Sequence, residues 1–293
     1  MGNFTVSLDF ELGWGAIETG LWRMREDKDV YSKLRPTLKR IANLLDELEI
    51  SLTWATVGAM ISAPSQEDFD YLPLPFQSRA KEFLASAAST SKDGRDLFDL
   101  VASTSTPQDI GSHSFSHTRF QEKTFTEAQK AIEMQKSIAA LNAFGITPQS
   151  FVFPVNQVAS YNVVEQAGIK VARTPPKTPD GKVGKLVEKI CGYTPTAIRT
   201  NHHGGLNVES GSMLYYWGLN SDWRLRRTLV QNQVRAGLKA ATDSDHHLHL
   251  WLHPFNLVEI PTLEQEFCKL LKKAAKLRDA DKLRIKPMSP VPS

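Results

Sequence analysis

The chain has 293 residues, enough for one large α/β barrel or two modest domains, and we expect a single domain over residues 1–293. Its hydrophobic content of 41% and charged content of 23% are ordinary for a globular protein and argue against wholesale disorder and against a membrane protein. The formal charge of +3 arises from scattered Lys and Arg, which argues against nucleic acid as a partner, and the 2 cysteines lie outside any CxxC pattern, which argues against a disulfide scaffold.

The first predicted strand covers residues 4–11, where apolar and polar side chains alternate with the two-residue period of a strand. Asp9 and Glu11 fall on its polar face, near its C-terminal end. If the apolar face packs on helices, the polar face points into a barrel, and barrel enzymes keep their chemistry at the C-terminal ends of the strands. The two carboxylates are therefore candidate site residues.

The sequence carries no visible leader or membrane anchor. A basic segment followed by a long apolar segment, as in a signal peptide, is not seen before the first predicted strand. No apolar run is long enough to cross a bilayer. We therefore expect a cytoplasmic protein with no integral membrane segment.

Strand-like and helix-like segments alternate along the rest of the chain. Further strands are predicted at residues 51–57, 108–112, 150–153, 169–172 and 247–252. Helices are predicted at residues 31–48, 126–144, 158–167, 223–241 and 263–278. Residues 61–108 are less regular, with helical character around residues 77–88, and residues 174–210 have no clear period, so both stretches are expected to be irregular insertions. Such alternation predicts an α/β fold with a mostly parallel sheet or barrel.

Two histidines, His113 and His117, follow the predicted strand at 108–112. Imidazoles four residues apart can bind one metal ion, although such a pair alone is more often structural or solvent-facing. Together with Glu11 they form a set of one carboxylate and two imidazoles with positions left open for water and substrate. This set suits Zn²⁺ or another divalent transition ion.

The late strand at 247–252 supplies a further candidate. Its polar face carries His249 and Trp251 and is extended by His253 at the C-terminal end, whereas His249 lies deeper. Hydrolysis of an amide or ester needs a base for the attacking water and an acid for the leaving group. Asp9 is placed to be the base, and His253 is the better catalytic candidate of the late strand.

In their order along the chain, these motifs resemble those of the polysaccharide deacetylases with a NodB-homology domain, which form carbohydrate esterase family four. The matching segments are Asp9 with Glu11, His113 with His117, Trp251-Leu252-His253-Pro254, and residues 53–58, which look like the second strand of the family. The resemblance extends over nearly the whole chain, from about residue 6 to residue 256.

The resemblance implies a distorted (β/α) barrel with predominantly parallel strands, forming a single catalytic domain. It also implies a metal-dependent reaction that removes N- or O-acetyl groups from sugars. Carried over to the matching positions, Asp9 is the general base, His253 is the general acid, and Glu11, His113 and His117 are the metal ligands.

Two positions depart from the family pattern. Phe10 separates the two carboxylates, where many members have adjacent aspartates. The family's Arg-x-Pro-Tyr motif appears as residues 152–155, Val-Phe-Pro-Val, so the arginine that usually steadies the catalytic aspartate is absent. Arg23 and Arg173 are the candidates to replace it.

The resemblance also suggests how the substrate is held. In the family, the backbone amide after the proline of this motif helps to hold the oxyanion, and a backbone donor does not depend on the side chain, so Pro154 and Val155 can still form that site. Trp14 and Trp251 are candidates to stack on a sugar ring, with Trp14 preferred, although such residues are more often plain core.

The leading hypothesis is a metal-dependent deacetylase of an acetylated sugar, sugar precursor or oligosaccharide, which could serve surface-polysaccharide biosynthesis. A second hypothesis is a hydrolase of a non-sugar C–N bond, like the allantoinase-like or deformylase-like relatives. A third is a sugar-binding barrel that has lost turnover together with the arginine. The oligomeric state is left open.

Overall fold

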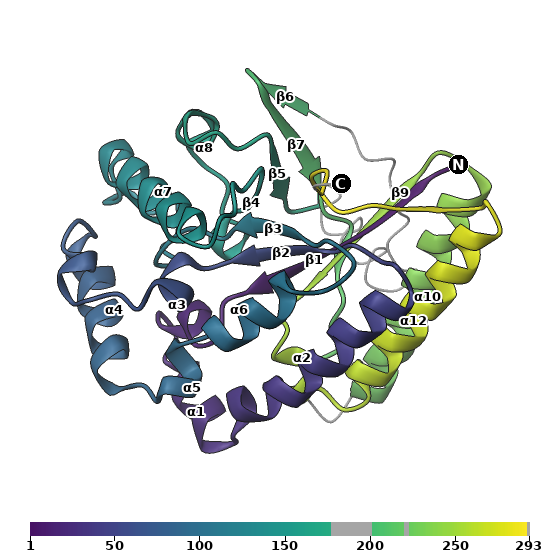
Figure 1. Cartoon of the computed structure of the whole chain (residues 1–293), viewed down its shortest axis with the longest axis horizontal. Helices are drawn as coiled ribbons and strands as arrows, with labels where there is room; N and C mark the ends of the chain where they lie inside the picture. The colour runs from purple at the N-terminus through teal and green to yellow at the C-terminus, as the bar shows by residue number, and fades with distance from the viewer. Residues whose placement is uncertain (177–200, 220–222, 292–293) are drawn as a thin grey trace.

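The computed structural model describes residues 1–176, 201–219 and 223–291. Ten strands in this part of the chain form one sheet with the order β6-β7-β5-β4-β3-β2-β1-β9-β8, and β10 pairs with β1 (Figure 1). The strands are β1 (Asn3–Phe10), β2 (Thr53–Thr56), β3 (Asp109–Ser112), β4 (Ser150–Val152), β5 (Val171–Thr174), β6 (Asn201–His203), β7 (Leu206–Ser210), β8 (Met213–Leu214), β9 (His247–Leu252) and β10 (Arg284–Ile285). Neighbouring strands are parallel except β6 and β7, which confirms the predicted parallel α/β fold.

Helices lie around the outside of this sheet in Figure 1. The α-helices are α1 (Leu21–Asp27), α2 (Val30–Glu47), α3 (Gly58–Ser62), α4 (Leu74–Ser86), α5 (Ser89–Lys92), α6 (Arg95–Ala102), α7 (Glu127–Asn142), α8 (Tyr161–Gln166), α10 (Trp223–Asp243), α11 (Asn256–Glu259) and α12 (Leu263–Asp279). Short 3₁₀ helices are η1 (Trp14–Ala16), η2 (Glu67–Phe69) and η3 (Pro154–Asn156). The predicted alternation of strands and helices is therefore correct.

A short connection between β7 and β8 joins the two ends of the sheet and makes it a distorted barrel. β7 pairs with β5 and β8 pairs with β9, yet only Gly211 and Ser212 separate β7 from β8. The Gly211 N–H donates to the Thr174 carbonyl at 2.8 Å, and the Ser212 N–H donates to the His249 carbonyl at 2.7 Å. A Cβ atom on Gly211 would lie 2.9 Å from the Trp251 ring, so the connection requires glycine.

The polar faces of β1 and β9 meet inside the barrel, as the alternating pattern predicts. Ser7 Oγ lies 2.9 Å from His249 Nε2, and Thr5 Oγ1 lies 2.7 Å from His247 Nε2. The apolar side chains of β1 belong to the hydrophobic core, and they are Phe4, Val6, Leu8 and Phe10. These two hydroxyl–imidazole pairs satisfy polar groups that would otherwise be buried without a hydrogen-bond partner.

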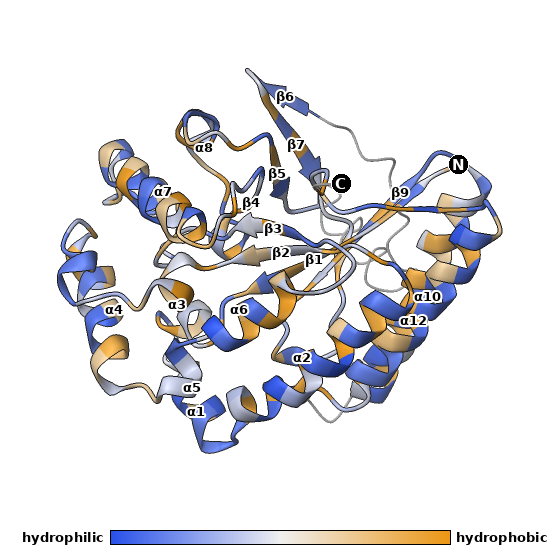
Figure 2. Ribbon diagram, in the orientation of Figure 1, coloured by the Kyte–Doolittle hydropathy of each residue, from blue (hydrophilic) through white to orange (hydrophobic). Residues whose placement is uncertain are grey.

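The helices cover the outer face with amphipathic surfaces. Figure 2 shows hydrophobic and hydrophilic residues along α2, α6 and α12. The buried residues of α2 include Leu34, Leu38, Ile41 and Leu45, which follow the helical period. α7 begins with a capping box between Thr126 and Gln129, and the chain turns after it at Gly145, whose φ is 75°.

Residues 61–108 are more regular than expected: α4 matches the helical character expected around residues 77–88, and α5 and α6 follow it. In α4, Phe76, Ala80 and Phe83 recur at helical spacing and are buried. The Phe83 ring packs on the Trp14 ring with 4.9 Å between centroids. Ser, Thr and Asp residues around these short helices obscured the period, and the segment covers the loop that follows β1.

The second predicted irregular stretch is only partly described. Of residues 174–210, those from 177 to 200 lie outside the described residues. Residues 201–210 are not irregular, because β6 and β7 pair as an antiparallel hairpin. Leu206 and Val208 alternate with more exposed residues and are 0% and 3% exposed, which is the period of a strand.

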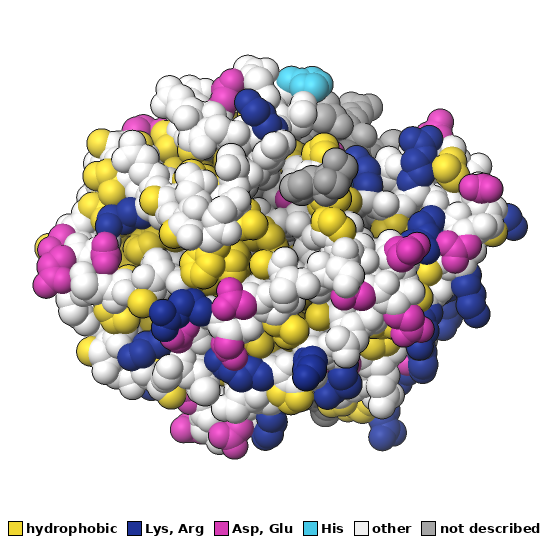
Figure 3. Space-filling view, viewed as in Figure 1, with side chains coloured by type: hydrophobic (Ala, Val, Ile, Leu, Met, Phe, Trp, Pro, Cys, Tyr) yellow, Lys and Arg dark blue, Asp and Glu magenta, His cyan; other side chains and the backbone are white. Residues whose placement is uncertain are grey.

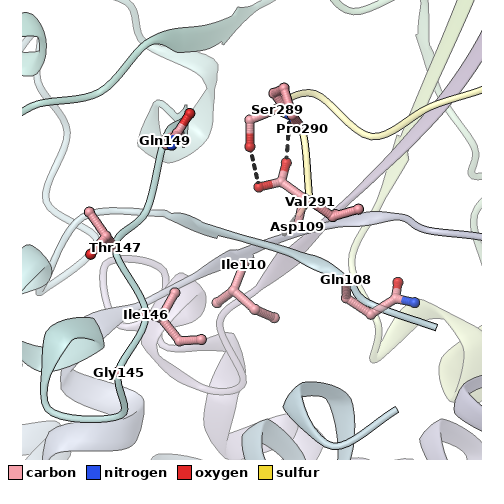
Figure 4. A pocket seen from close by; sticks show the side chains of 10 residues that line it. All are labelled: Gln108, Asp109, Ile110, Gly145, Ile146, Thr147, Gln149, Ser289, Pro290 and Val291. Atoms are coloured by element: carbon pink, nitrogen blue, oxygen red, sulfur yellow. Dashed lines mark hydrogen bonds between the residues drawn. The ribbon is translucent and has the colours of Figure 1, made fainter. Parts of the chain in front are cut away.

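The C-terminal tail runs across the N-terminal ends of the strands, opposite the candidate site. The Ser289 N–H and Oγ donate to the two carboxylate oxygens of Asp109, at 3.1 and 2.6 Å. A pocket of about 320 Å³ lies beside this contact, and Pro290 and Val291 help to line it (Figure 4). The tail after residue 286 is mostly irregular as predicted, but it is bound to β3.

Charged side chains of both signs are spread over the molecular face in Figure 3, where Lys and Arg are interspersed with Asp and Glu. Among the helices of the described residues, none combines the length and the apolar character that crossing a membrane demands.

Candidate metal and catalytic centre

The predicted carboxylate and two imidazoles meet at the C-terminal end of the barrel. Glu11 follows β1, and His113 and His117 lie on the loop that follows β3. One ligand atom from each of these buried residues lies within 4.8 Å of the others. The Nε2 atoms of His113 and His117 are 3.3 and 2.9 Å from Glu11 Oε2. Gly15 leaves room for this carboxylate, because a Cβ there would lie 1.9 Å from Glu11 Oε1.

The hydrogen bonding of His113 and Glu11 leaves atoms that could bind a cation. His113 Nδ1 lies 2.7 Å from the Val152 carbonyl, which can only accept, so Nδ1 carries a proton and Nε2 is the ring atom available to a metal ion. Glu11 Oε2 is buried and has no hydrogen-bond partner among the described residues, although both Nε2 atoms are near it. A buried carboxylate oxygen without a hydrogen-bond partner is unfavourable unless a positive charge lies beside it. The residues present therefore fit a divalent metal ion.

The pKa of Glu11 follows from these neighbours. Burial by itself raises the pKa of this carboxyl, but His117 and His253 attract its charged form, and the pKa lies well below its usual range. Glu11 is therefore ionised at neutral pH, as a metal ligand must be.

Asp9 is bound by Arg173, one of the two arginines predicted to replace the missing motif arginine. Arg173 Nη1 donates to Asp9 Oδ1 at 2.7 Å and Nη2 donates to Asp9 Oδ2 at 2.8 Å. Arg173 also donates to Ser7 Oγ at 2.7 Å and to Asn156 Oδ1 at 3.1 Å. Burial raises the pKa of Asp9, but the charge and hydrogen bonds of Arg173, with smaller effects of His113 and His253, bring it below the usual value.

The other predicted candidate, Arg23, lies elsewhere. It pairs with Glu82, and its guanidinium carbon lies 4.1 Å from the Trp22 ring centroid. Of the two candidates, Arg173 is the one that contacts the aspartate.

His253 stands at the open side of the same centre. Its Nε2 atom lies 3.9 Å from Asp9 Oδ2 and 3.6 Å from Glu11 Oε1, and 29% of its side chain is exposed. Its Nδ1 atom lies 3.2 Å from Asn256 Oδ1. The ring also stacks on Phe255 with centroids 5.0 Å apart. This imidazole is therefore oriented by two neighbours and reachable from solvent.

Pro154 and Val155 follow β4 at the same end of the barrel. Val155 has φ of 55° and is 54% exposed, and Asn156 has φ of 53°. A positive φ is unusual for a β-branched residue and marks a constrained turn. Asn156, which ends this turn, is held by Arg173. The turn is thereby linked to Asp9 through one side chain.

The expected sugar platforms are not on the surface, so this expectation is corrected. Trp14 is 0% exposed, its ring lies between Phe69 and Phe83, and its N–H donates to the Lys92 carbonyl at 2.9 Å. Trp251 is 8% exposed, and its ring lies 5.2 Å from the Arg173 guanidinium carbon. Trp14 is core, and Trp251 supports Arg173.

Sequence reasoning missed several residues that hold this centre: Ser7, Val152, Asn156 and Asn256. Ser7 shares the inward face of the first strand with Asp9, so the two-residue period could have found it. The others act through a backbone carbonyl or a side-chain amide, and no local pattern in the sequence marks them.

Known structures share the fold. Crystal structures named as polysaccharide deacetylases from Mycobacterium smegmatis and Pseudomonas aeruginosa PAO1 match with a TM-score of 0.51 each, at 14% and 13% identity. The matches cover 99% and 97% of this chain and 94% and 87% of those chains. An allantoinase structure matches with a TM-score of 0.53 and 12% identity, covering 97% of this chain and 86% of that one. Neither a protein-family model nor a curated protein sequence matches the chain.

These identities establish similarity of fold. The distorted (β/α) barrel that the motif resemblance implied is confirmed, and it is seen in structures named as deacetylases and as an allantoinase. The chain has the NodB-type barrel fold of the polysaccharide deacetylase structures.

Proposed function

We propose that this chain is a metal-dependent hydrolase that removes the acetyl group from an N- or O-acetylated sugar, with residues 1–293 as one catalytic domain. The observation that carries the proposal is the convergence of Glu11, His113 and His117 within 4.8 Å, next to Asp9 and His253. This supports the roles expected from the sequence, because ligands, base and acid lie at one end of the barrel.

Zn²⁺ is the ion that we propose, held by Glu11, His113 and His117. A set of three protein ligands with oxygen and imidazole nitrogen donors is typical of catalytic zinc. The bound ion would supply a Lewis acid that acidifies water and polarises the acyl carbonyl. The protein's part is to present the Nε2 atoms of two imidazoles beside an ionised carboxylate.

Asp9 accepts the proton of the attacking water in this proposal. Arg173 keeps the carboxylate ionised and fixes its plane through two hydrogen bonds. Arg173, on the neighbouring strand β5, thus replaces the arginine that is absent at residue 152. Trp251 keeps the guanidinium in place from its other side.

His253 donates a proton to the leaving nitrogen or oxygen. It is the exposed member of the centre, so it can reach a substrate that enters from solvent. Asn256 Oδ1 can accept a hydrogen bond from the Nδ1–H group, which leaves Nε2 for the proton transfer. The backbone N–H of Val155, after Pro154, is proposed to donate to the oxyanion.

The finer parts of the proposal come from the sequence resemblance. They are an acetylated sugar, sugar precursor or oligosaccharide as substrate and a role in surface-polysaccharide biosynthesis.

A second candidate function is hydrolysis of a non-sugar C–N bond. It is favoured by the shared fold with an allantoinase structure. A deformylase-like reaction belongs to the same class and would release formate instead of acetate. An inactive sugar-binding barrel is the third candidate, and the ion pair of Arg173 with Asp9 argues against it, because the arginine has a replacement.

The experiment first measures the metal content of the purified protein. Acetate release from N-acetylated and O-acetylated sugars is then assayed before chelation, after chelation and after Zn²⁺ is added back. Acetate release that is lost on chelation and restored by Zn²⁺ is expected. Bound metal with release of another product would favour the second candidate. Bound metal without turnover on any substrate would favour the binding barrel, and absence of metal binding would overturn the proposal.

A further inference from the structure

A buried carboxylate on α7 holds the loop that carries the two candidate imidazole ligands. Glu133 is 0% exposed. Its Oε1 atom accepts hydrogen bonds from the backbone N–H groups of Phe115 and Ser116, at 2.9 and 2.7 Å. Ser116 Oγ donates to both oxygens, at 3.0 and 2.9 Å, and the Tyr71 hydroxyl donates to Oε2. Phe115 and Ser116 lie between His113 and His117.

The loop needs such support because its backbone is strained. Ser114 has φ of 64° and His117 has φ of 63°, both in the left-handed region that non-glycine residues seldom adopt. The Ser114 N–H donates to Ser112 Oγ at 3.1 Å, and that oxygen lies 2.8 Å from Ser137 Oγ, also on α7. One face of α7 therefore holds both halves of the loop.

The left-handed backbone at Ser114 and His117 brings the two imidazoles together. With the loop turned through two left-handed residues, the imidazoles approach each other with ring centroids 4.8 Å apart and an angle of 71° between planes. Both Nε2 atoms then face Glu11. Two N–H groups bonded to one rigid helical carboxylate determine the path of the backbone between the imidazoles.

We infer that Glu133 is a positioning residue for the metal site: it sets the backbone from which His113 and His117 reach the ion. This rests on the proposed function and extends it to α7 and, through Tyr71, to the helical segment 61–108. Supporting residues of metal ligands contribute about 10- to 100-fold to metal affinity in known sites.

The test is the dissociation constant for Zn²⁺, measured by competition with a chelating indicator, together with the Tm of each metal-free protein. Glu133→Met has similar length but removes every acceptor, and it should weaken Zn²⁺ binding by about 10- to 100-fold. Glu133→Gln should recover most of the affinity, because its amide oxygen can face the two N–H groups while the Ser116 and Tyr71 hydroxyls turn to accept from the amide nitrogen. Glu127→Met, at an exposed site of the same helix, is the matched control and should bind as the original chain does.

If Glu133→Met does not fold, Glu133→Asp is the second variant. It keeps the carboxylate but is one methylene shorter, so it cannot reach both N–H groups without moving the loop, and about 10-fold weaker binding is expected. Zn²⁺ affinity unchanged in Glu133→Met or Glu133→Asp, even with a lower Tm, would reduce Glu133 to a folding role and overturn the inference. Absence of Zn²⁺ binding by the original chain would instead show that the proposed metal site fails.

Discussion

Arg173 is the residue on which the state of Asp9 depends. The two side chains are 1% and 5% exposed, and they form two hydrogen bonds of 2.7 and 2.8 Å. The family motif places this arginine at residue 152, on β4, where this chain has valine. In this chain it comes from β5, the next strand in the sheet, and it reaches the same carboxylate from there.

Loss of Arg173 should destabilise the fold strongly. Arg173→Ala leaves Asp9 as an uncompensated buried carboxylate, so we expect a loss of about 3–5 kcal/mol in the free energy of unfolding. Adding Asp9→Asn should recover part of that loss, because the buried charge is gone. Urea unfolding of the single and double variants measures this coupling.

The control is Arg40→Ala, which breaks the more exposed pair with Glu264 and should cost less than about 1 kcal/mol. Additive effects of Arg173→Ala and Asp9→Asn would contradict the assigned ion pair.

The ligand and proton-transfer roles separate in a second set of variants. Asp9→Asn and His253→Ala should lower turnover by about 10²- to 10⁴-fold and still bind Zn²⁺, because neither side chain is assigned as a ligand. His113→Ala should lose both turnover and tight binding. Acetate assays and zinc analysis on the same preparations distinguish the cases.

His202→Ala, on the exposed strand β6, is the control for these variants and should change neither quantity. Tight Zn²⁺ binding in His113→Ala would show that the ligand set has been assigned wrongly.

At the scale of elements, β9 illustrates how a strand carries buried histidines. Burial, with a smaller effect of Lys286, lowers the pKa of His247 to about 3. Burial also lowers the pKa of His249 well below its usual value, with smaller effects of His247, Arg173 and Lys286. Both imidazoles lie against hydroxyls of β1 and are neutral in the folded protein.

These histidines should make the protein less stable in mild acid. Between the lowered pKa and the ordinary value of 6.5, the unfolded chain binds protons that the folded chain does not, so stability falls as pH falls through 6.5. From about pH 7.5 to about pH 5 we expect a loss of about 2 kcal/mol for each histidine. Urea unfolding at the two pH values measures it.

His247→Gln should reduce the pH dependence by about half, and His202→Gln, at an exposed position, should leave it unchanged. The same pH dependence in His247→Gln and in the original chain would contradict a neutral buried imidazole.

At the scale of the whole molecule, the proposed metal would join segments far apart in sequence. Glu11 follows β1, and the two imidazoles follow β3, with β2 between these strands in the sheet. Ligand binding to the folded state alone stabilises it by mass action. The metal should therefore act on global stability as well as on the site.

Zn²⁺ at about 100 times its dissociation constant should add about 2.7 kcal/mol to the free energy of unfolding. Denaturant unfolding with and without Zn²⁺ measures this. His113→Ala should show little of the gain, and Mg²⁺ should stabilise less because it prefers oxygen ligands. Equal stabilisation of His113→Ala and the original chain would mean that Zn²⁺ acts elsewhere.

The amino-acid pattern alone determined most strands and helices and the members of the candidate centre. The inward face of β1, the helix ends at Gly145 and Gly168 and the barrel end of Asp9, Glu11, His113 and His253 follow from local spacing. These features depend on periodicity within one segment and on the rule that parallel strands end together.

The tertiary structure decided which side chains serve that centre. Arg173 rather than Arg23 meets Asp9, Trp14 is covered by the helices of residues 61–108, the tail binds Asp109, and Glu133 holds the histidine loop. Each of these contacts joins segments that are distant in sequence. Their formation depends on barrel curvature and side-chain reach, and local residue spacing carries no information about either.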